Sequence, residues 1–173
     1  MEENQAAIRR LFDEVYNGHN LDVIGELVAE DVVNHSATDE HKHGVGGFRH
    51  VMKWGGALMP DGRYELLDTI AEGDMAACRV RVSGTMRGEP FGVPPTGKSA
   101  TFEHVHWHRV SGGKLVERWA ARDDLEALIQ FGIIDPPGRS EADSPDYRRR
   151  HPPERVEGVR RAARGTQPSP VYL

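Results

Sequence analysis

The feature of the sequence that most constrains its fold is a run of four segments in which apolar and polar residues alternate with a period of two. These segments are residues 63–71, 75–86, 99–110 and 115–123. Such alternation is typical of strands that bury one face. The turn sequences Glu72-Gly73-Asp74 and Ser111-Gly112-Gly113-Lys114 join two consecutive pairs. We therefore expect antiparallel hairpins at both turns.

Helical patterns lie on either side of these strands. Residues 5–17 place apolar side chains at helical spacing, and a shorter helix is expected after Asn20, a residue type that favours helix starts. Further helices are expected around residues 48–58 and over 124–131. Helices followed by consecutive hairpins predict an α+β fold, with a curved antiparallel sheet packed against the N-terminal helices.

The composition of the 173-residue chain changes after Asp135. Seven of its eleven prolines and eight arginines lie in residues 136–173, with almost no apolar periodicity. Such a segment lacks the apolar surface to form a core. We therefore expect one domain over residues 1–135, followed by a Pro/Arg-rich C-terminal tail over residues 136–173.

Charge and composition disfavour several classes of protein. The net charge is −5 while the tail carries +3, so residues 1–135 carry −8, which disfavours nucleic-acid binding. No apolar run approaches the ~20 residues that span a bilayer, and the first ten residues do not read as a signal peptide, so we expect no membrane partner and a cytoplasmic location. A single cysteine, Cys78, excludes an intramolecular disulfide framework and a Cys-based zinc module.

The register of the last hairpin predicts a group of side chains on one face. With Gly112-Gly113 as a two-residue turn, His106 lies opposite Trp119 and His108 opposite Glu117. The inner face would then carry Phe102, His104, His106, His108, Trp119 and Asp123. Such a mixture of apolar and titratable side chains is typical of a small-molecule site. A one-residue bulge in either strand would change this prediction.

Alternative interpretations exist for the titratable residues. Asp123, followed by Asp124, is also a natural N-cap for the last helix. The three histidines form a possible metal set, but at alternate positions along a strand they spread over ~13 Å, at ~3.3 Å per residue, so no metal is expected. His35 is suited equally to lining a pocket and to capping a loop.

Four motifs occur together in the second half of the sequence: the loop from Gly92 to Lys98, the pair His108-Arg109, the stretch from Gly113 to Trp119, and Asp123. They resemble those of the SnoaL-like polyketide cyclases, within the NTF2-like superfamily. In the N-terminal half, Tyr16-Asn17-Gly18, Asn34-His35 and Gly47-Phe48-Arg49 are similar too. The resemblance covers about residues 4–135. It implies a cone-shaped α+β barrel around a deep apolar pocket.

The resemblance also implies a chemistry, which is intramolecular aldol condensation of a hydrophobic, polyketide-like small molecule without metal or cofactor. Asp123 would be the acid/base, and His104 and His106 would assist it by donating to the enolate oxygen. The remaining expected substrate-binding residues are Asn34, His35, Phe12, Tyr16, Phe48, Met52, Trp54, Phe102, His108 and Trp119. Ala121 stands where family cyclases often carry a histidine, which leaves other reactions open.

Three alternatives to a cyclase therefore remain. The first is water addition on the same scaffold, as in a hydroxylase or an epoxide hydrolase. The second is a non-catalytic protein that binds hydrophobic ligands. The third is a structural dimer subunit whose pocket is filled by its own side chains. For each of these functions, the outer sheet face, with Trp107 on it, predicts a sheet-to-sheet homodimer or a higher homo-oligomer. A monomer in a sizing experiment would contradict that prediction.

Overall fold

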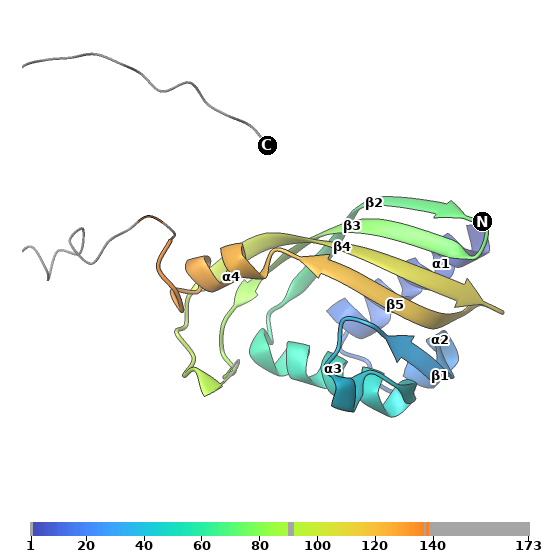
Figure 1. The fold of residues 1–173 in the computed structure, drawn as a ribbon, viewed down its shortest axis with the longest axis horizontal. Helices are drawn as coiled ribbons and strands as arrows, with labels where there is room; N and C mark the ends of the chain where they lie inside the picture. The colour runs from blue at the N-terminus through green and yellow to red at the C-terminus, as the bar shows by residue number, and fades with distance from the viewer. Residues whose placement is uncertain (1, 90–91, 137, 139–173) are drawn as a thin grey trace, which may run out of the picture. The chain divides into compact units, whose positions relative to one another are not determined.

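The computed structural model describes residues 2–89, 92–136 and 138 (Figure 1). The chain divides after Asp135, and the fold below is that of the unit ending there. The predicted tail lies almost wholly outside the described residues. The described part of the chain is α+β, as predicted, with helices and one sheet. Among these residues, no helix combines the length and the apolar character needed to cross a membrane.

The N-terminal helix is continuous but changes its winding. Helix α1 (Glu2–Arg10) passes directly into a π-helix, Leu11–Asn17, where the single helix over 5–17 was predicted. The backbone N–H of Gly18 ends it by donating to the carbonyl oxygen of Asp13 at 3.0 Å. The π-helical segment buries Leu11, Phe12, Val15 and Tyr16. Segments of this kind are frequent at functional sites.

The other helices are short or lie against the sheet. They are α2 (Ile24–Leu27), a 3₁₀ turn at Asp39–His41, α3 (Gly44–Leu58) and α4 (Asp124–Gln130). The patterns around 48–58 and 124–131 therefore mark real helices, although α3 begins four residues earlier than its apolar pattern.

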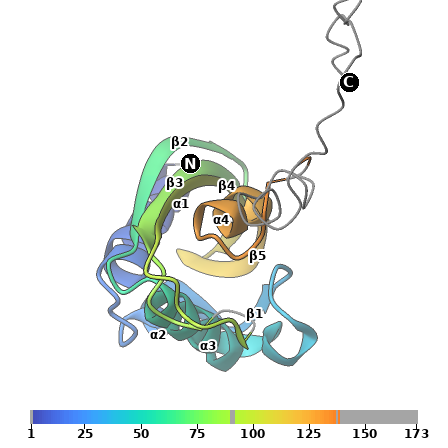
Figure 2. The same ribbon diagram turned by 90° about the vertical axis from the view of Figure 1, so that its left-hand side faces the viewer.

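The sheet has five strands in the order β1-β5-β4-β3-β2. The strands are β1 (Val28–Asn34), β2 (Arg63–Glu72), β3 (Met75–Thr85), β4 (Ser99–Ser111) and β5 (Lys114–Arg122). The four predicted strands are β2 to β5, and all their contacts with one another are antiparallel. The sheet is curved, and α4 lies within the curl of β3, β4 and β5 (Figure 2).

One part of the predicted architecture is wrong, because the sheet is mixed rather than antiparallel throughout. Strand β1 pairs in parallel with β5, and the sheet ends on β1 and β2 without closing into a barrel. Parallel neighbours need a long crossover connection, which here contains α3 and strands β2 to β4. Pairing between segments so far apart in the chain leaves no mark on local periodicity.

The core lies between the helices and the inner face of the sheet. Alternate residues of β3 and β4 are buried, from Ala76 to Val82 and from Ala100 to Val110. They pack with apolar side chains of the helices, including Phe12 and Phe48, both fully buried. The same alternation that buries the apolar residues of β4 also buries three histidines.

Candidate functional site

The β4–β5 hairpin begins in the predicted register. Gly112 and Gly113 have φ values of 56° and 75°, a conformation that favours glycine and suits a two-residue hairpin turn. Ser111 lies opposite Lys114, and the next pair continues the same register. The following pair is Arg109 with Glu117, so Val116 is an extra residue in β5. This is a β-bulge.

The bulge makes the rest of the predicted register wrong. His108 lies opposite Arg118 rather than Glu117, His106 opposite Ala120, and His104 opposite Arg122. An extra residue exchanges the two faces of a strand, because side chains alternate with a period of two. Beyond the bulge, the inner face of β5 therefore carries Arg118, Ala120 and Arg122 in place of the predicted Trp119 and Asp123.

Trp119 and His35 consequently lie together on the other side of β5. Trp119 pairs with the exposed Trp107 across the strands. The His35 imidazole stacks on Trp119 with ring centroids 4.5 Å apart. His35 Nε2 lies 3.2 Å from Glu117 Oε1. Trp119 thus does not share a face with the three histidines.

Asp123 lies at the start of α4, where it is exposed. Its carboxylate accepts a hydrogen bond from the backbone N–H of Glu126 at 3.2 Å. Its own backbone N–H donates to the carbonyl oxygen of Glu103 at 3.1 Å. The geometry is that of the helix N-cap considered as the alternative for this residue. An acid/base role for Asp123 stays a prediction.

The other predicted wall residues are distributed between core and surface. Phe12, Tyr16, Phe48 and Phe102 are buried, and Met52 is half-buried against the core. Trp54 is 42% exposed on α3. The Phe12 ring stacks on Tyr16 at 4.5 Å and meets the His106 ring edge-on at 5.5 Å. An aromatic wall therefore lies against the inner-face histidines.

The bulge brings a buried cation to the inner face. Arg118 is only 4% exposed. Its Nη1 donates to Asn34 Oδ1 at 2.9 Å, and its Nη2 donates to His106 Nδ1 at 3.1 Å. None of the ion pairs found within the described part of the chain includes Arg118. Arg118 is therefore a buried charge whose neighbours are neutral.

These bonds determine the orientation of both partner side chains. Since a guanidinium only donates, His106 Nδ1 accepts and its ring proton lies on Nε2. Asn34 Oδ1 accepts from Arg118 and from the backbone N–H of Ser36, at 3.2 Å. The amide nitrogen of Asn34 is thus available to donate. We call Asn34, His106, Arg118 and Tyr16 the donor cluster.

The donor cluster has unused hydrogen-bonding capacity. Four buried atoms, one from each residue, have no hydrogen-bond partner among the described residues: Arg118 Nε, His106 Nε2, Asn34 Nδ2 and the Tyr16 hydroxyl. Buried polar groups are nearly always paired. Three of these atoms can only donate, so a bound water or ligand must offer them an acceptor.

His104 and His108 extend the cluster along β4. His108 Nδ1 contacts the sulfur of Cys78 at 4.0 Å. Burial raises the pKa of the Cys78 thiol to about 12, which keeps its proton available to donate. Neither ring nitrogen of His104 has a partner. His108 Nε2 also lacks a partner, but with the Cys78 thiol donating to His108 Nδ1 that nitrogen carries the ring proton. His104 is then the histidine of the row with an unused acceptor nitrogen.

The three histidines are neutral at ordinary pH. Burial lowers the pKa of His104 and His108 to about 3, reinforced at His104 by the charges of Arg122 and then Arg118, and at His108 by that of Arg118. The same causes hold the pKa of His106 well below its usual value. Burial also raises the pKa of Tyr16. The site therefore combines one permanent positive charge with neutral donors and one neutral base.

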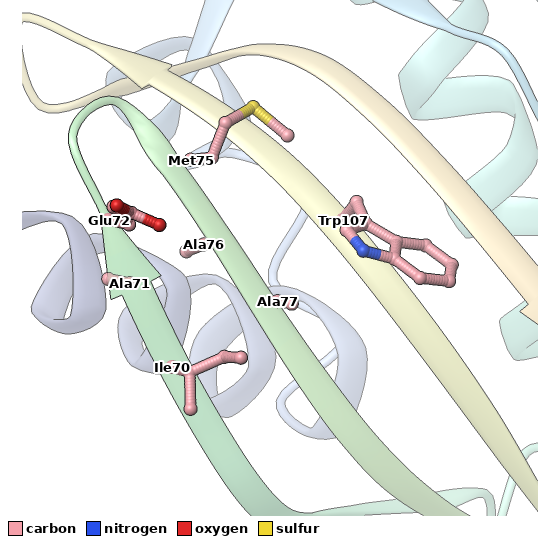
Figure 3. Close-up of a pocket in the computed structure, with 7 residues that line it drawn as sticks. All are labelled: Ile70, Ala71, Glu72, Met75, Ala76, Ala77 and Trp107. Atoms are coloured by element: carbon pink, nitrogen blue, oxygen red, sulfur yellow. The ribbon is translucent and has the colours of Figure 1, made fainter.

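A separate hollow lies on the outer face of the sheet. It has a volume of about 430 Å³ and is lined by Ile70, Ala71, Glu72, Met75, Ala76, Ala77 and Trp107 (Figure 3). Its walls come from β2, β3 and β4, with the helices behind the sheet in this view. None of the donor-cluster residues lines it. The homodimer predicted through this face stays a prediction.

One residue of the site escaped the sequence reasoning. The predicted register leaves Arg118 off the inner face, although the adjacent apolar residues Leu115 and Val116 are a local sign of a change of face. Within residues 2–89, 92–136 and 138, no group of three or more His, Cys, Asp or Glu side chains is arranged to hold a metal ion.

The chain matches a known protein family. A family model described as SnoaL-like polyketide cyclase matches residues 6–131. No curated protein matches the chain significantly. The structure of IdmH from Streptomyces antibioticus, provisionally described as a polyketide cyclase, is 31% identical, covers 75% of this chain and 98% of its own, and has a TM-score of 0.65.

Two further structures are similar. AclR from Streptomyces galilaeus, provisionally described as a hydroxylase, is 27% identical over 78% of this chain and 98% of its own, with a TM-score of 0.67. A SnoaL-like protein from Jannaschia sp. CCS1 is 22% identical over 79% and 94% of the two chains, with a TM-score of 0.69. At that identity the likeness concerns the fold alone.

Proposed function

Because the chain belongs to the SnoaL-like polyketide cyclase family, we propose that it is a cofactor-independent enzyme that closes a ring in a polyketide-type molecule by intramolecular aldol condensation. The observation that supports this best is the donor cluster, with its buried, unpartnered N–H groups beside the Arg118 charge. Aldol chemistry generates an enolate oxygen, and fixed donors and charge are what stabilise such an oxygen.

The donor cluster would hold the developing enolate. Removal of a proton between two carbonyl groups places negative charge on oxygen. Arg118, His106 Nε2–H and the Asn34 amide are already oriented by their mutual hydrogen bonds, so little reorganisation accompanies the reaction. Donors arranged in this way are typically worth ~3 kcal/mol each. In the free protein, ordered water would occupy the same position.

His104 is the proton acceptor that fits the cluster best. Its ring centroid lies 5.5 Å from that of His106, and its acceptor nitrogen is unused. Burial lowers the pKa of His104 most, and the charges of Arg122 and Arg118 lower it further. Negative charge arriving beside Arg118 offsets this positive potential. In the proposed step, the carbon acid gives its proton to His104, the new C–C bond forms, and the alkoxide takes the proton back.

The aromatic side chains would hold the flexible substrate in a folded conformation. Phe12 and Tyr16 stack on one another beside His106, and Phe102 lies 5.2 Å from His104, centroid to centroid. An apolar chain packed on these rings brings its two reacting carbons together, which is the proximity contribution to catalysis.

The experiment that tests this function is product analysis. We expect the purified protein to convert a synthetic linear poly-β-ketone ester into a cyclic product of the same mass, or one lighter by water after dehydration. The reaction is run in ¹⁸O-labelled water with chelator present. A product that gains the elements of water, with ¹⁸O from the solvent, would favour the alternative of water addition. A product that gains an unlabelled oxygen atom would instead indicate a hydroxylase, which is how AclR is provisionally described.

The choice between two proton acceptors is testable by substitution. We expect His104→Phe, which keeps a ring of similar shape, to reduce turnover at least ~100-fold, the usual contribution of a general base. Asp123→Asn keeps the α4 cap, since asparagine is an equally good N-cap. We expect it to reduce turnover less than ~10-fold, as measured by initial rates.

The opposite ranking would support the other assignment. If Asp123→Asn abolishes turnover in a folded protein and His104→Phe does not, Asp123 is the acid/base that the family resemblance implies. Circular dichroism and the melting temperature of both variants provide the folding control, because neither the cap nor the ring volume is lost.

A further inference from the structure

We infer that the donor cluster is a binding site for a preformed anion, so that the substrate class is a molecule that carries a carboxylate and binds in its ionised form. The inference rests on the proposed function, because it takes the donor cluster to be the substrate-binding site. It goes further because it concerns the charge of the molecule that binds before any proton is moved.

The guanidinium of Arg118 has no counter-ion among the described residues. Arg118 is 4% exposed, and a buried ion without a partner is strongly unfavourable. The acidic residues of the hairpin do not reach it: Glu103 pairs with Arg79, and Glu117 pairs with Arg109 and His35. An anionic ligand would supply the charge that the described part of the protein does not.

The unpartnered atoms beside the guanidinium are hydrogen-bond donors. Arg118 Nε, His106 Nε2 and Asn34 Nδ2 all donate. A neutral carbonyl compound satisfies such donors but leaves the guanidinium charge uncompensated. An anionic oxygen satisfies both, through charge-assisted hydrogen bonds, which are about twice as strong as neutral ones. The cluster should therefore favour an anion over a neutral molecule of the same shape.

The charge state of the surrounding histidines is compatible with a negative charge at Arg118. His104, His106 and His108 are all neutral in the free protein and lie beside Arg118 or next to its partner. An anion at Arg118 stabilises the protonated form of each of them. Arg122, opposite His104 on the inner face, adds positive potential of the same sign.

The structure also offers a substitution that mimics the bound anion. Asn34 Oδ1 already accepts from Arg118 and from Ser36. Asn34→Asp keeps these two bonds and replaces the amide nitrogen with a second carboxylate oxygen. The variant carries its own counter-ion at the site. It should bind an external anion poorly while remaining folded, and its melting temperature should rise.

The test uses benzoate and its neutral isostere benzamide on the whole chain, without substrate or turnover. We expect calorimetry to show benzoate binding at least ~10-fold more tightly than benzamide, a ratio of the size that one charge-assisted hydrogen bond adds. Asn34→Asp should remove this preference. Arg79→Met, a charge removed on the outer face, should keep it.

Each outcome decides the inference independently of the proposed function. Equal affinity for the two probes, or a benzoate preference that survives in Asn34→Asp, would overturn the anion site even if the protein cyclises its substrate. A benzoate preference lost only in Asn34→Asp would support it even if product analysis showed no cyclisation. The ¹⁵N chemical shift of His106 Nε2, moving with benzoate alone, locates the binding.

Discussion

Replacing Arg118 with methionine is expected to reduce turnover about a thousandfold while leaving the protein folded. Loss of a single oxyanion donor typically costs 10²–10³ in rate, and Arg118 supplies both a donor and the charge of the cluster. It also orients Asn34 and His106. Initial rates of product formation, compared between wild type and Arg118→Met, measure the effect.

Stability separates this catalytic role from a structural one. An apolar residue of similar volume in place of a buried, unpaired charge is often neutral or stabilising, so we expect the melting temperature of Arg118→Met not to fall. Arg118→Lys should keep part of the rate, since it keeps the charge and loses the planar fork. A folded Arg118→Met protein with wild-type turnover would exclude the donor cluster from the reaction.

Much of the fold could be predicted because local patterns specify it. The alternation in β3 and β4 marks which residues are buried, and the two positive-φ glycines at 112 and 113 mark the hairpin turn. The parallel pairing of β1 with β5 could not be predicted in the same way. It depends on contacts between segments more than eighty residues apart, which no short window of sequence contains.

The composition of the site depended on one residue. A period-two pattern indicates which residues share a face, but not where an extra residue exchanges the faces. The histidines on β4 lie on the inner face as predicted, whereas the bulge at Val116 brings Arg118 to that face instead of Trp119. The buried guanidinium donates hydrogen bonds to Asn34 and His106, which no sequence rule pairs with it.

Acid is expected to destabilise the protein strongly between pH 6.5 and 3. His104 and His108 have a pKa of about 3 in the folded chain, against an ordinary value of 6.5 in the unfolded chain. Between these values the unfolded state binds more protons, so stability falls as the pH falls. Each histidine contributes ~1.4 kcal/mol per pH unit, and from pH 6 to pH 4 the two together remove about 5 kcal/mol. Urea unfolding at several pH values measures this slope.

The slope can be assigned to individual buried histidines. Since small domains are stable by only 5–15 kcal/mol, a loss of this size places acid unfolding near pH 4. His104→Phe removes one titrating group and should reduce the slope by ~1.4 kcal/mol per pH unit. A free energy of unfolding that stays constant from pH 6 to pH 4 would mean that the histidines bind protons inside the fold. The three histidines of β4 could then not be the neutral donors and the neutral base on which the proposed enolate chemistry depends.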